Sequence, residues 1–247
     1  NKNTKLILTV HTSNYVIKGF TKSVSLSDLV SLGHKNTIPV MVDWGSGSFL
    51  SGIPNSPSLD IPINKLMKCK PDIITFSGDK LIGGPQSGII VGEKRIIDIL
   101  QTNTLYRTVR PDKLTIALLD EILRSYDTNS FTKNNLSLNL LSSSQKTLQA
   151  RGEKVMKNIK KSKIKNYNIQ LMKSKVEAGS GSLPEKKISS MAIVFEAKSK
   201  KCSGLAEKFR KGKIPVIGFI NDDKFYIDLK AVLPNQLIKL SQAINSI

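Results

Sequence analysis

The chain has few of the residues that cross-link small proteins or bind metal ions. Its 247 residues include two cysteines, Cys69 and Cys202, and no CxxC spacing. We therefore expect neither a disulfide framework nor a structural zinc site, and this cysteine usage is typical of a reducing cytoplasm. Two histidines, His11 and His34, are too few for a histidine-rich site, so we expect no bound metal.

Long apolar runs are also missing. None approaches the roughly 18 residues that a membrane-spanning helix needs, which predicts a soluble protein with no membrane partner. The first residues contain neither an initiator Met nor the apolar core of a signal peptide, and TKLILTV at 4–10 follows almost directly. This start is typical of the middle of a domain, so we expect the chain to be N-terminally incomplete.

Acidic residues are scarce relative to basic ones. The chain has 38 Lys+Arg against 19 Asp+Glu, a net charge of +19. Such an excess favours a polyanionic partner, nucleic acid above all. A lysine bias from an AT-rich genome would produce the same excess. The basic segment KNIKKSKIK at 157–165 fits either a solvated helix face or an RNA track, and we favour the solvated face.

The first half of the chain alternates strand and helix patterns. Short apolar runs fit buried strands at 4–10, 39–43, 72–76 and 87–93. Helices are predicted at 26–33, closed by Gly33, and from residue 94 in KRIIDILQ. Apolar strands alternating with helices predict an α/β unit with a mostly parallel sheet covered on both faces.

The second half has a different pattern of predicted helices and strands. Helices are predicted at 111–126, 137–163, 203–211 and 234–246, and strands at 167–176, 190–196, 215–220 and 224–229. The polar stretch DTNSFTKNN at 127–135 is interpreted as a linker. We place a boundary near residue 128, which divides the chain into a large domain at 1–128 and a small α+β domain at 129–247.

Polar residues follow three of the predicted strands. His11 to Asn14 come after the first strand, Asp43 ends the second, and Ser77 to Lys80 come after the third. Ligands of open parallel sheets bind beyond the carboxyl ends of the strands. We therefore expect these three clusters to converge in one crevice.

Asp43 and Lys80 have the clearest chemical meaning. A carboxylate at a strand end can cap a turn, or it can pair with the protonated ring nitrogen of pyridoxal phosphate. A lysine is usually a solvated surface charge, but in a cleft it can form a Schiff base. Ser77 and the loop GGPQSG at 83–88 offer a hydroxyl and backbone amides to a phosphate. Together these residues favour a pyridoxal-phosphate site.

Arg107 and Arg110 lie three residues apart in LYRTVRPDK. On a helix they would share a face. Two arginines can clamp a phosphate or a carboxylate. A solvated basic face explains the same pattern, and without other evidence we favour it.

The segment TFSGDKLIGGPQSGIIVG at 75–92 resembles the cofactor-lysine segment of bacterial selenocysteine synthase, L-seryl-tRNA(Sec) selenium transferase, a family of fold-type-I pyridoxal-phosphate enzymes. The resemblance continues, in order, in VHTSNYVIKGFT (10–21), VMVDWGSG (40–47), LYRTVRPDKLT (105–115), GSGSLP (179–184) and PVIGFINDDKFYIDLKAVLP (215–234). It covers essentially the whole chain. Trp44 after Asp43 departs from what we expect in the family, and so does the missing N-terminal region.

The resemblance implies a role for each candidate residue. Lys80 would carry pyridoxal 5'-phosphate covalently, Asp43 would pair with its ring nitrogen, and Ser77 would contact its phosphate. Asn14 would lie near the phenolic oxygen of the ring, and His11 would also contact the cofactor. The selenium donor and the leaving group would be surrounded by Asp79, Arg107 and Arg110.

The family's reaction converts seryl-tRNA(Sec) to selenocysteinyl-tRNA(Sec) through an aminoacrylyl intermediate, with selenophosphate as selenium donor and Lys80 placed to take the α-proton. The resemblance also implies a cytoplasmic homo-oligomer, since the family forms decamers. A tRNA partner would account for the charge of +19.

Two alternatives stay open. The first is a paralogous pyridoxal-phosphate lyase that acts on an amino-sugar phosphate, which shares Lys80 and Asp43 but needs no tRNA. The second is a non-catalytic, RNA-binding or oligomerising fragment, which the unusual start of the chain supports. The retention of Lys80, Asp43 and Ser77 favours an enzyme.

Overall fold

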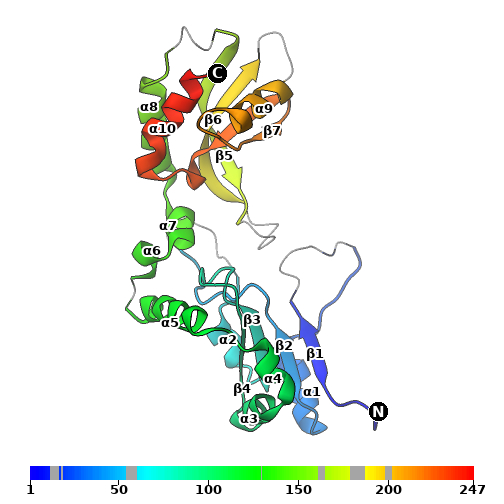
Figure 1. Ribbon diagram of the computed structural model, residues 1–247. Coiled ribbons are helices and arrows are strands. Elements are labelled where there is room, and N and C mark those ends of the chain that lie inside the picture. The colour runs from blue at the N-terminus through cyan, green and yellow to red at the C-terminus, as the bar shows by residue number, and fades with distance from the viewer. Residues whose placement is uncertain are drawn as a thin grey trace. The chain divides into compact units, whose positions relative to one another are not determined.

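The computed structural model describes residues 1–11, 17, 19–53, 60–128, 130–160, 165–178, 187–197 and 202–247 (Figure 1). The chain forms two compact units, the first from residues 1–53, 57–139 and 177–186, and the second from residues 54–56, 140–176 and 187–247. The longest segment of the first unit ends at residue 139, and the second unit continues from residue 140. The division into functional domains near residue 128 stays a prediction.

A four-stranded sheet is the centre of the first unit. Its strands, in spatial order, are β1 (Ile7–Val10), β2 (Val40–Asp43), β3 (Ile73–Ser77) and β4 (Gly88–Gly92). The first three are parallel and β4 is antiparallel to β3. The predicted mostly parallel α/β sheet is therefore confirmed. β4 reverses direction because the link from residue 78 to 87 contains no helix, and a parallel crossover needs a dozen or more residues.

The strand at the start of the chain is less buried than the sequence predicts. β1 is an edge strand, and Leu8 and Val10 are each 55% exposed. The apolar core lies instead around β2 and β3, which contribute Val42, Ile74, Phe76 and neighbouring side chains. A continuous apolar run therefore indicated a strand correctly, but it did not indicate how well neighbours cover that strand.

The helices of the first unit are α1 (Leu26–Lys35), α2 (Ile63–Met67), α3 (Lys94–Thr102), α4 (Thr104–Val109), α5 (Lys113–Asp127), α6 (Phe131–Asn134) and the start of α7 (Leu136–Ser142). Side-chain oxygens of Ser25 and Asp112 accept hydrogen bonds from backbone N–H groups and cap α1 and α5. The predicted linker at 127–135 is wrong, because α6 lies within it and Asn135 is buried.

Gly33 does not end α1, contrary to the prediction. The helix continues to Lys35, and Gly33 is buried within it. A Cβ atom on Gly33 would lie 2.4 Å from Val40 Cγ2 and 2.7 Å from the Ile38 carbonyl oxygen. The glycine therefore allows α1 to approach β2 closely, and the sequence pattern alone could not distinguish this use from a helix stop.

The second unit is an antiparallel sheet with helices on one face. Its strands, in spatial order, are β5 (Tyr167–Val176), β6 (Ile188–Ala197), β8 (Lys224–Asp228) and β7 (Phe219–Asn221). Helices α8 (Gln145–Lys157), α9 (Ser203–Lys211) and α10 (Leu237–Asn245) and the 3-10 turns Leu229–Ala231 and Pro234–Gln236 complete it. The predicted small α+β unit is confirmed.

The core of the second unit is aromatic. Phe209 of α9 stacks on Phe225 of β8, with ring centroids 5.1 Å apart, and meets Phe195 of β6 edge-on. Leu148 of α8 and Leu240 of α10 belong to the same cluster. Figure 1 shows α8 and α10 side by side against this sheet. All three helices thus pack on one core, with their other faces in solvent.

One helix predicted at 137–163 is two helices. α7 ends at Ser142, and α8 starts after Ser144, whose hydroxyl accepts a hydrogen bond from the N–H of Thr147. Residues 161–163 of the predicted helix lie outside the described residues. Among the described helices, none is long and apolar enough to cross a membrane.

Candidate functional site

The carboxyl ends of β1, β2 and β3 lie at one edge of the first sheet. In the parallel register Val10 pairs with Asp43, and Asp43 pairs with Thr75. The N–H of His11 donates to the Asp43 carbonyl oxygen at 2.9 Å. The structure therefore brings His11, Asp43 and Ser77 to the same edge. Asn14, predicted beside them, lies outside the described residues.

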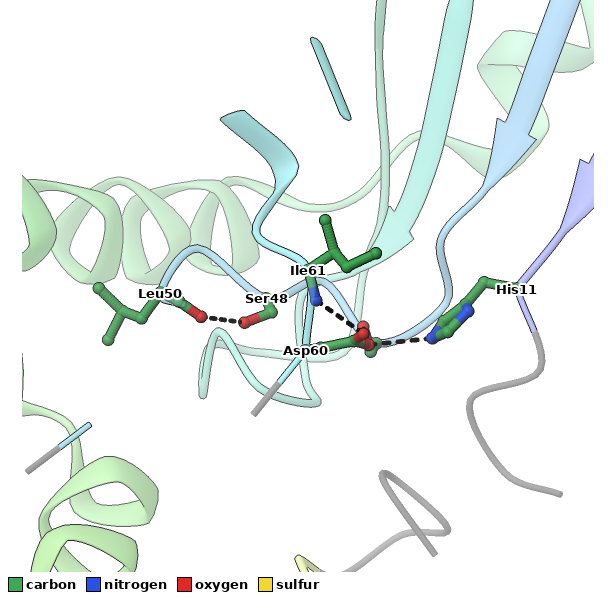
Figure 2. A network of polar contacts seen from close by, with 6 residues as sticks. His11, Ser48, Leu50, Asp60 and Ile61 are labelled. Carbon is green, nitrogen blue, oxygen red and sulfur yellow. Dashed lines mark hydrogen bonds and ion pairs between the residues drawn. The ribbon is translucent and has the colours of Figure 1, made fainter. Parts of the chain in front are cut away.

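His11 is held in place by two neighbours. Its Nε2 lies 3.0 Å from Asp60 Oδ2, and its ring stacks on the Trp44 indole with centroids 3.8 Å apart. Figure 2 shows the His11–Asp60 contact and the hydrogen bond from the Ile61 N–H to the same carboxylate. The Ser46 hydroxyl donates to Asp60 as well, at 2.6 Å. His11 therefore has a fixed ring at the edge of the site.

Asp60 is an anion in spite of its burial. Burial by itself raises the pKa of the Asp60 carboxyl, but the hydrogen bonds from His11 and Ser46 outweigh it, and the pKa lies below its usual range. Sequence reasoning missed Asp60. Its side-chain partners lie 49 and 14 residues away along the chain, and no local pattern marks such a residue.

Lys80 sits in a tight turn after β3. The Gly78 N–H donates to Ser87 O at 2.9 Å, and Gly78 O accepts from the Gly84 N–H at 2.8 Å. A Cβ atom on Gly78 would lie 2.2 Å from Ser87 Oγ and 3.1 Å from Pro85 O, so a side chain there would require the Ser87 hydroxyl to move. Lys80 is half-buried, and its ammonium makes no hydrogen bond or ion pair with any described residue. Its amine is available to a ligand. Asp79 beside it is exposed.

The chain after Lys80 is anchored from two directions. The Tyr126 hydroxyl of α5 donates to Leu81 O at 3.3 Å and to Ile82 O at 3.0 Å. Asn135 Nδ2 donates to Ile82 O at 2.5 Å. Burial raises the pKa of Tyr126, which keeps this hydroxyl a donor at neutral pH. Sequence reasoning missed both residues, since α5 carried no polar motif and 127–135 was interpreted as a linker.

The same anchor explains a glycine in the loop. Gly83 has φ +75°, and a Cβ atom there would lie 2.3 Å from Asn135 Nδ2. A side chain at this position would meet both backbone strain and a clash. The loop GGPQSG is therefore shaped by its packing against Asn135 as well as by its turn.

Arg107 and Arg110 are not brought to Lys80 by the described contacts. α4 ends at Val109, and Arg110 has extended backbone angles, so the two arginines do not share a helix face. α3, which leads to α4, begins after Gly92, the residue that pairs with Ile73 at the start of β3. This is the sheet end opposite to Lys80, as Figure 1 shows for α3. Both guanidinium groups are exposed, without ion pairs to described residues. Their role stays a prediction.

The residues at this edge fit pyridoxal phosphate. The cofactor needs a primary amine, a carboxylate for its ring nitrogen and donors for its phosphate. Lys80 offers the amine. Asp43 offers a carboxylate in which Oδ1 accepts from the Thr75 hydroxyl at 3.2 Å while Oδ2 has no partner among the described residues. The Ser77 hydroxyl is likewise unpaired there. The buried Trp44 indole N–H also has no acceptor among the described residues, which is rare and suits a bound acceptor.

Comparisons with known proteins agree with this chemistry. The family model described as L-seryl-tRNA selenium transferase matches residues 1–233. The L-seryl-tRNA(Sec) selenium transferase of Escherichia fergusonii is 38% identical over 240 residues, which is 94% of this chain and 51% of that protein. The protein of the same name from Alkaliphilus oremlandii is 38% identical over 248 residues, covering 100% of this chain and 53% of its own.

A solved structure shows the same fold. The chain superposes on D-glucosaminate-6-phosphate ammonia-lyase with a TM-score of 0.59 at 17% identity, covering 96% of this chain and 56% of the other. This similarity shows the fold alone, an α/β fold of the fold-type-I pyridoxal-phosphate enzymes. The chain spans about half the length of the curated relatives it matches. Because the family model matches 1–233 of its 247 residues, the chain belongs to the L-seryl-tRNA selenium transferase family.

Proposed function

We propose that this chain forms part of a pyridoxal-phosphate enzyme that converts seryl-tRNA(Sec) to selenocysteinyl-tRNA(Sec) with selenophosphate as selenium donor. The observation that carries the proposal is Lys80, an unpaired, half-buried lysine in a glycine-shaped turn at the same sheet edge as Asp43, within a member of this family. The proposed partners are seryl-tRNA(Sec), selenophosphate and further copies of the chain in a cytoplasmic homo-oligomer.

Pyridoxal phosphate, when bound at Lys80, supplies an electron sink for the α-carbon of the seryl group. Lys80 Nζ, once the α-amine of the seryl group has taken its place on the cofactor, would be the base that takes the α-proton and returns it to the α-carbon after selenium has replaced the β-hydroxyl. Asp43 Oδ2 holds the proton on the ring nitrogen, since its partner oxygen Oδ1 is already occupied by Thr75. The Ser77 hydroxyl donates to the cofactor phosphate. His11, fixed by Asp60 and Trp44, orients the ring from the neighbouring strand end.

Asp79, Arg107 and Arg110 are proposed to act on the selenium donor and the leaving group. Asp79 is exposed beside Lys80, whereas the two exposed arginines follow α3 at the opposite end of the sheet, so they are proposed to act at the site of a neighbouring copy. Guanidinium groups stabilise the charge of a phosphate-bearing donor. Neither arginine is proposed as a ligand of the cofactor.

The lyase alternative has weaker support. The amino-sugar phosphate lyase shares the fold at 17% identity, which carries no statement about activity. The curated relatives at about 38% identity are selenium transferases. We therefore propose the selenium transferase.

The test uses covalent attachment of the cofactor. The purified chain is incubated with pyridoxal phosphate and reduced with borohydride, and its peptides are mapped by mass spectrometry. We expect the adduct on Lys80 and its loss in Lys80→Ala. The matched control is Lys68→Ala, which removes an exposed lysine of the same unit and should leave the adduct unchanged. An adduct of equal yield in Lys80→Ala, or one mapped to another lysine, would contradict the assignment.

A further inference from the structure

The positive charge of this chain is concentrated in the second unit. Residues 140–176 and 187–247 contain 21 Lys and Arg against six Asp and Glu, whereas the rest of the chain contains 17 against 13. A lysine bias of the genome would act on both units alike. The concentration of positive charge in the second unit is therefore better explained by a basic surface on that unit than by a lysine bias of the whole chain.

Eight of these 21 cations lie on the three helices of the second unit, and seven of the eight are exposed. α8 presents Lys146, Lys154 and Lys157, and α9 presents Lys208, Arg210 and Lys211, all of them exposed. Lys146 and Lys157 are eleven residues apart, so they share one face of α8 with an offset of about 20° and a separation of about 16 Å. Lys239 adds a further exposed cation on α10.

Few of these cations are neutralised. Lys211 pairs with Glu207 at 2.7 Å, but the other six make no ion pair or side-chain hydrogen bond with described residues. Of the five other acidic residues of the unit, Glu153 lies on α8, where it accepts a hydrogen bond from the Gln149 side chain. The other four lie on the sheet or at the β7–β8 turn: Glu196, Asp222, Asp223 and Asp228. Glu196 pairs with Lys224, and Asp228 accepts hydrogen bonds from Ser174 and Ser190. The helical layer thus has a net positive field that the unit itself does not screen.

A pocket continues this basic surface. It has a volume of about 380 Å³ and lies between α9 and the end of α10, with Lys208, Lys211 and Ser246 among its lining. Lys208 is the cation of this lining that makes no ion pair with described residues, since Lys211 pairs with Glu207 and the Ser246 hydroxyl donates to Ala243 O. The pocket is contiguous with the exposed lysines of α9.

We propose that the helical layer of the second unit, formed by α8, α9 and α10, binds the phosphate backbone of RNA. Spaced, unpaired cations on a rigid face neutralise successive phosphates and release their counterions. That this RNA is the substrate tRNA rests on the proposed function; the backbone-binding surface itself rests on the charge.

RNA fits this surface better than an anionic membrane. Helices that bind membranes place large apolar side chains beside their lysines to insert into the bilayer. In the described part of the chain, α8 and α9 expose no large apolar side chain, and α10 exposes one, Ile238. A face with seven exposed cations and a single exposed apolar side chain is better suited to a hydrated phosphate backbone than to insertion into a bilayer.

The experiment measures binding of the full chain to a fluorescein-labelled tRNA(Sec) transcript by anisotropy, over a series of salt concentrations. One variant carries Lys146→Gln, Lys154→Gln and Lys157→Gln, and a second carries Lys208→Gln, Arg210→Gln and Lys239→Gln. The matched control carries Lys22→Gln, Lys35→Gln and Lys68→Gln, three exposed lysines of the first unit, and loses the same charge. Circular dichroism confirms that each variant is folded.

We expect each helical variant to bind at least tenfold more weakly, and the slope of log affinity against log salt to fall by about two, since each phosphate contact contributes about 0.7–0.9. The control should keep the slope of the parent chain. Equal losses in all three variants would show a diffuse charge effect and overturn the proposal. Binding of phosphatidylglycerol vesicles in place of RNA would overturn it too.

Lys80→Ala separates this proposal from the proposed function. The helical surface does not include Lys80, so this variant should bind the transcript as tightly as the parent chain. Loss of the cofactor adduct with retained RNA binding supports both proposals. If the parent chain binds RNA through the helices but forms no cofactor adduct on Lys80, the RNA-binding surface is supported and the proposed enzyme function is contradicted.

Discussion

Tyr126 places a single hydroxyl on the two carbonyls that follow Lys80. Tyr126→Phe keeps the ring, which stacks on Phe131 with centroids 5.4 Å apart, and removes both hydrogen bonds. Leu81 O then loses its side-chain donor. We expect a loss of about 1 kcal/mol in the free energy of unfolding, measured with urea, and a lower yield of cofactor adduct.

Tyr106→Phe is the matched control for Tyr126, because the Tyr106 ring is partly exposed and its hydroxyl makes no hydrogen bond with described residues. It should change the free energy of unfolding by less than about 0.5 kcal/mol. Equal effects of the two substitutions would mean that the Tyr126 hydroxyl does not anchor the loop.

Asp60 makes the first unit sensitive to acid. Its pKa is lowered in the folded chain by His11 and Ser46, so its contribution to stability is fully present above the unfolded value near 4. That contribution is lost as pH falls through the lower, folded pKa. Asp60→Asn should therefore be less stable than the parent at pH 7, and the difference between the two should shrink at pH values below about 4.

Urea unfolding at several pH values tests this expectation for Asp60. Asp98→Asn is the control, since Asp98 is an exposed residue paired only with Lys94. A difference between the parent and Asp60→Asn that stays constant down to the lowest pH would show that Asp60 is not held as an anion by these contacts.

Some of these residues could be found in the sequence and others could not. The positions of Asp43 and Lys80, at the end of β2 and after the end of β3, were predictable because a strand end follows from a local apolar pattern. Their roles stay predictions. Asp60 and Tyr126 could not be identified from the sequence. The partner of Asp60, His11, lies 49 residues away along the chain, and the partner of Tyr126, Ile82, lies 44 residues away. Contacts at such separations depend on the fold, and no local pattern specifies them.

At the scale of elements, glycine positions decide how closely helices pack. Gly33 and Gly204 both lie within helices, but a Cβ atom on Gly33 would clash with Val40 and Ile38, while one on Gly204 would meet nothing within 4 Å. Gly33→Ala should lower the free energy of unfolding by about 1–3 kcal/mol. Gly204→Ala should raise it by about 0.5–1 kcal/mol, because alanine favours the helix.

Thermal or urea unfolding of both glycine variants gives the comparison. The two should change stability in opposite directions although the substitution is the same. A stabilising effect of Gly33→Ala would mean that α1 does not need its close approach to β2.

The elements themselves were largely predictable. Each strand of the first sheet falls within or near its predicted run, because apolar patterns of four to seven residues are local. Three features were not predictable from the sequence: the direction of β4, the exposure of β1 and the continuation of α1 past Gly33. Each of them depends on how a neighbouring element packs. Helix 137–163 was divided by the Ser144 cap, whose signal is weak among several serines.

At the scale of the whole molecule, the two units present different surfaces to their surroundings. Large apolar side chains of the first unit are exposed on α3, α4 and α5: Ile99, Leu100, Leu105, Tyr106, Val109, Leu114, Ile116 and Leu118. Exposed apolar patches of this kind mark protein–protein contacts. The exposure of these side chains supports the proposed homo-oligomer, and we propose that α3, α4 and α5 take part in its contact.

Association of the chain tests that assignment. Leu105 and Val109 lie four residues apart on α4 and are 70% and 74% exposed, so they share one face and can be changed without opening the core. Leu105→Glu with Val109→Glu should shift sedimentation from a concentration-dependent oligomer towards the monomer and leave the melting temperature within a few degrees. Ile238→Glu is the control, because Ile238 is 67% exposed on α10 of the second unit. It should leave association unchanged. A parent chain that sediments as a monomer at all concentrations would contradict the proposed contact. Equal effects of both changes would contradict it too, because a contact made by α4 should not depend on a charge on α10.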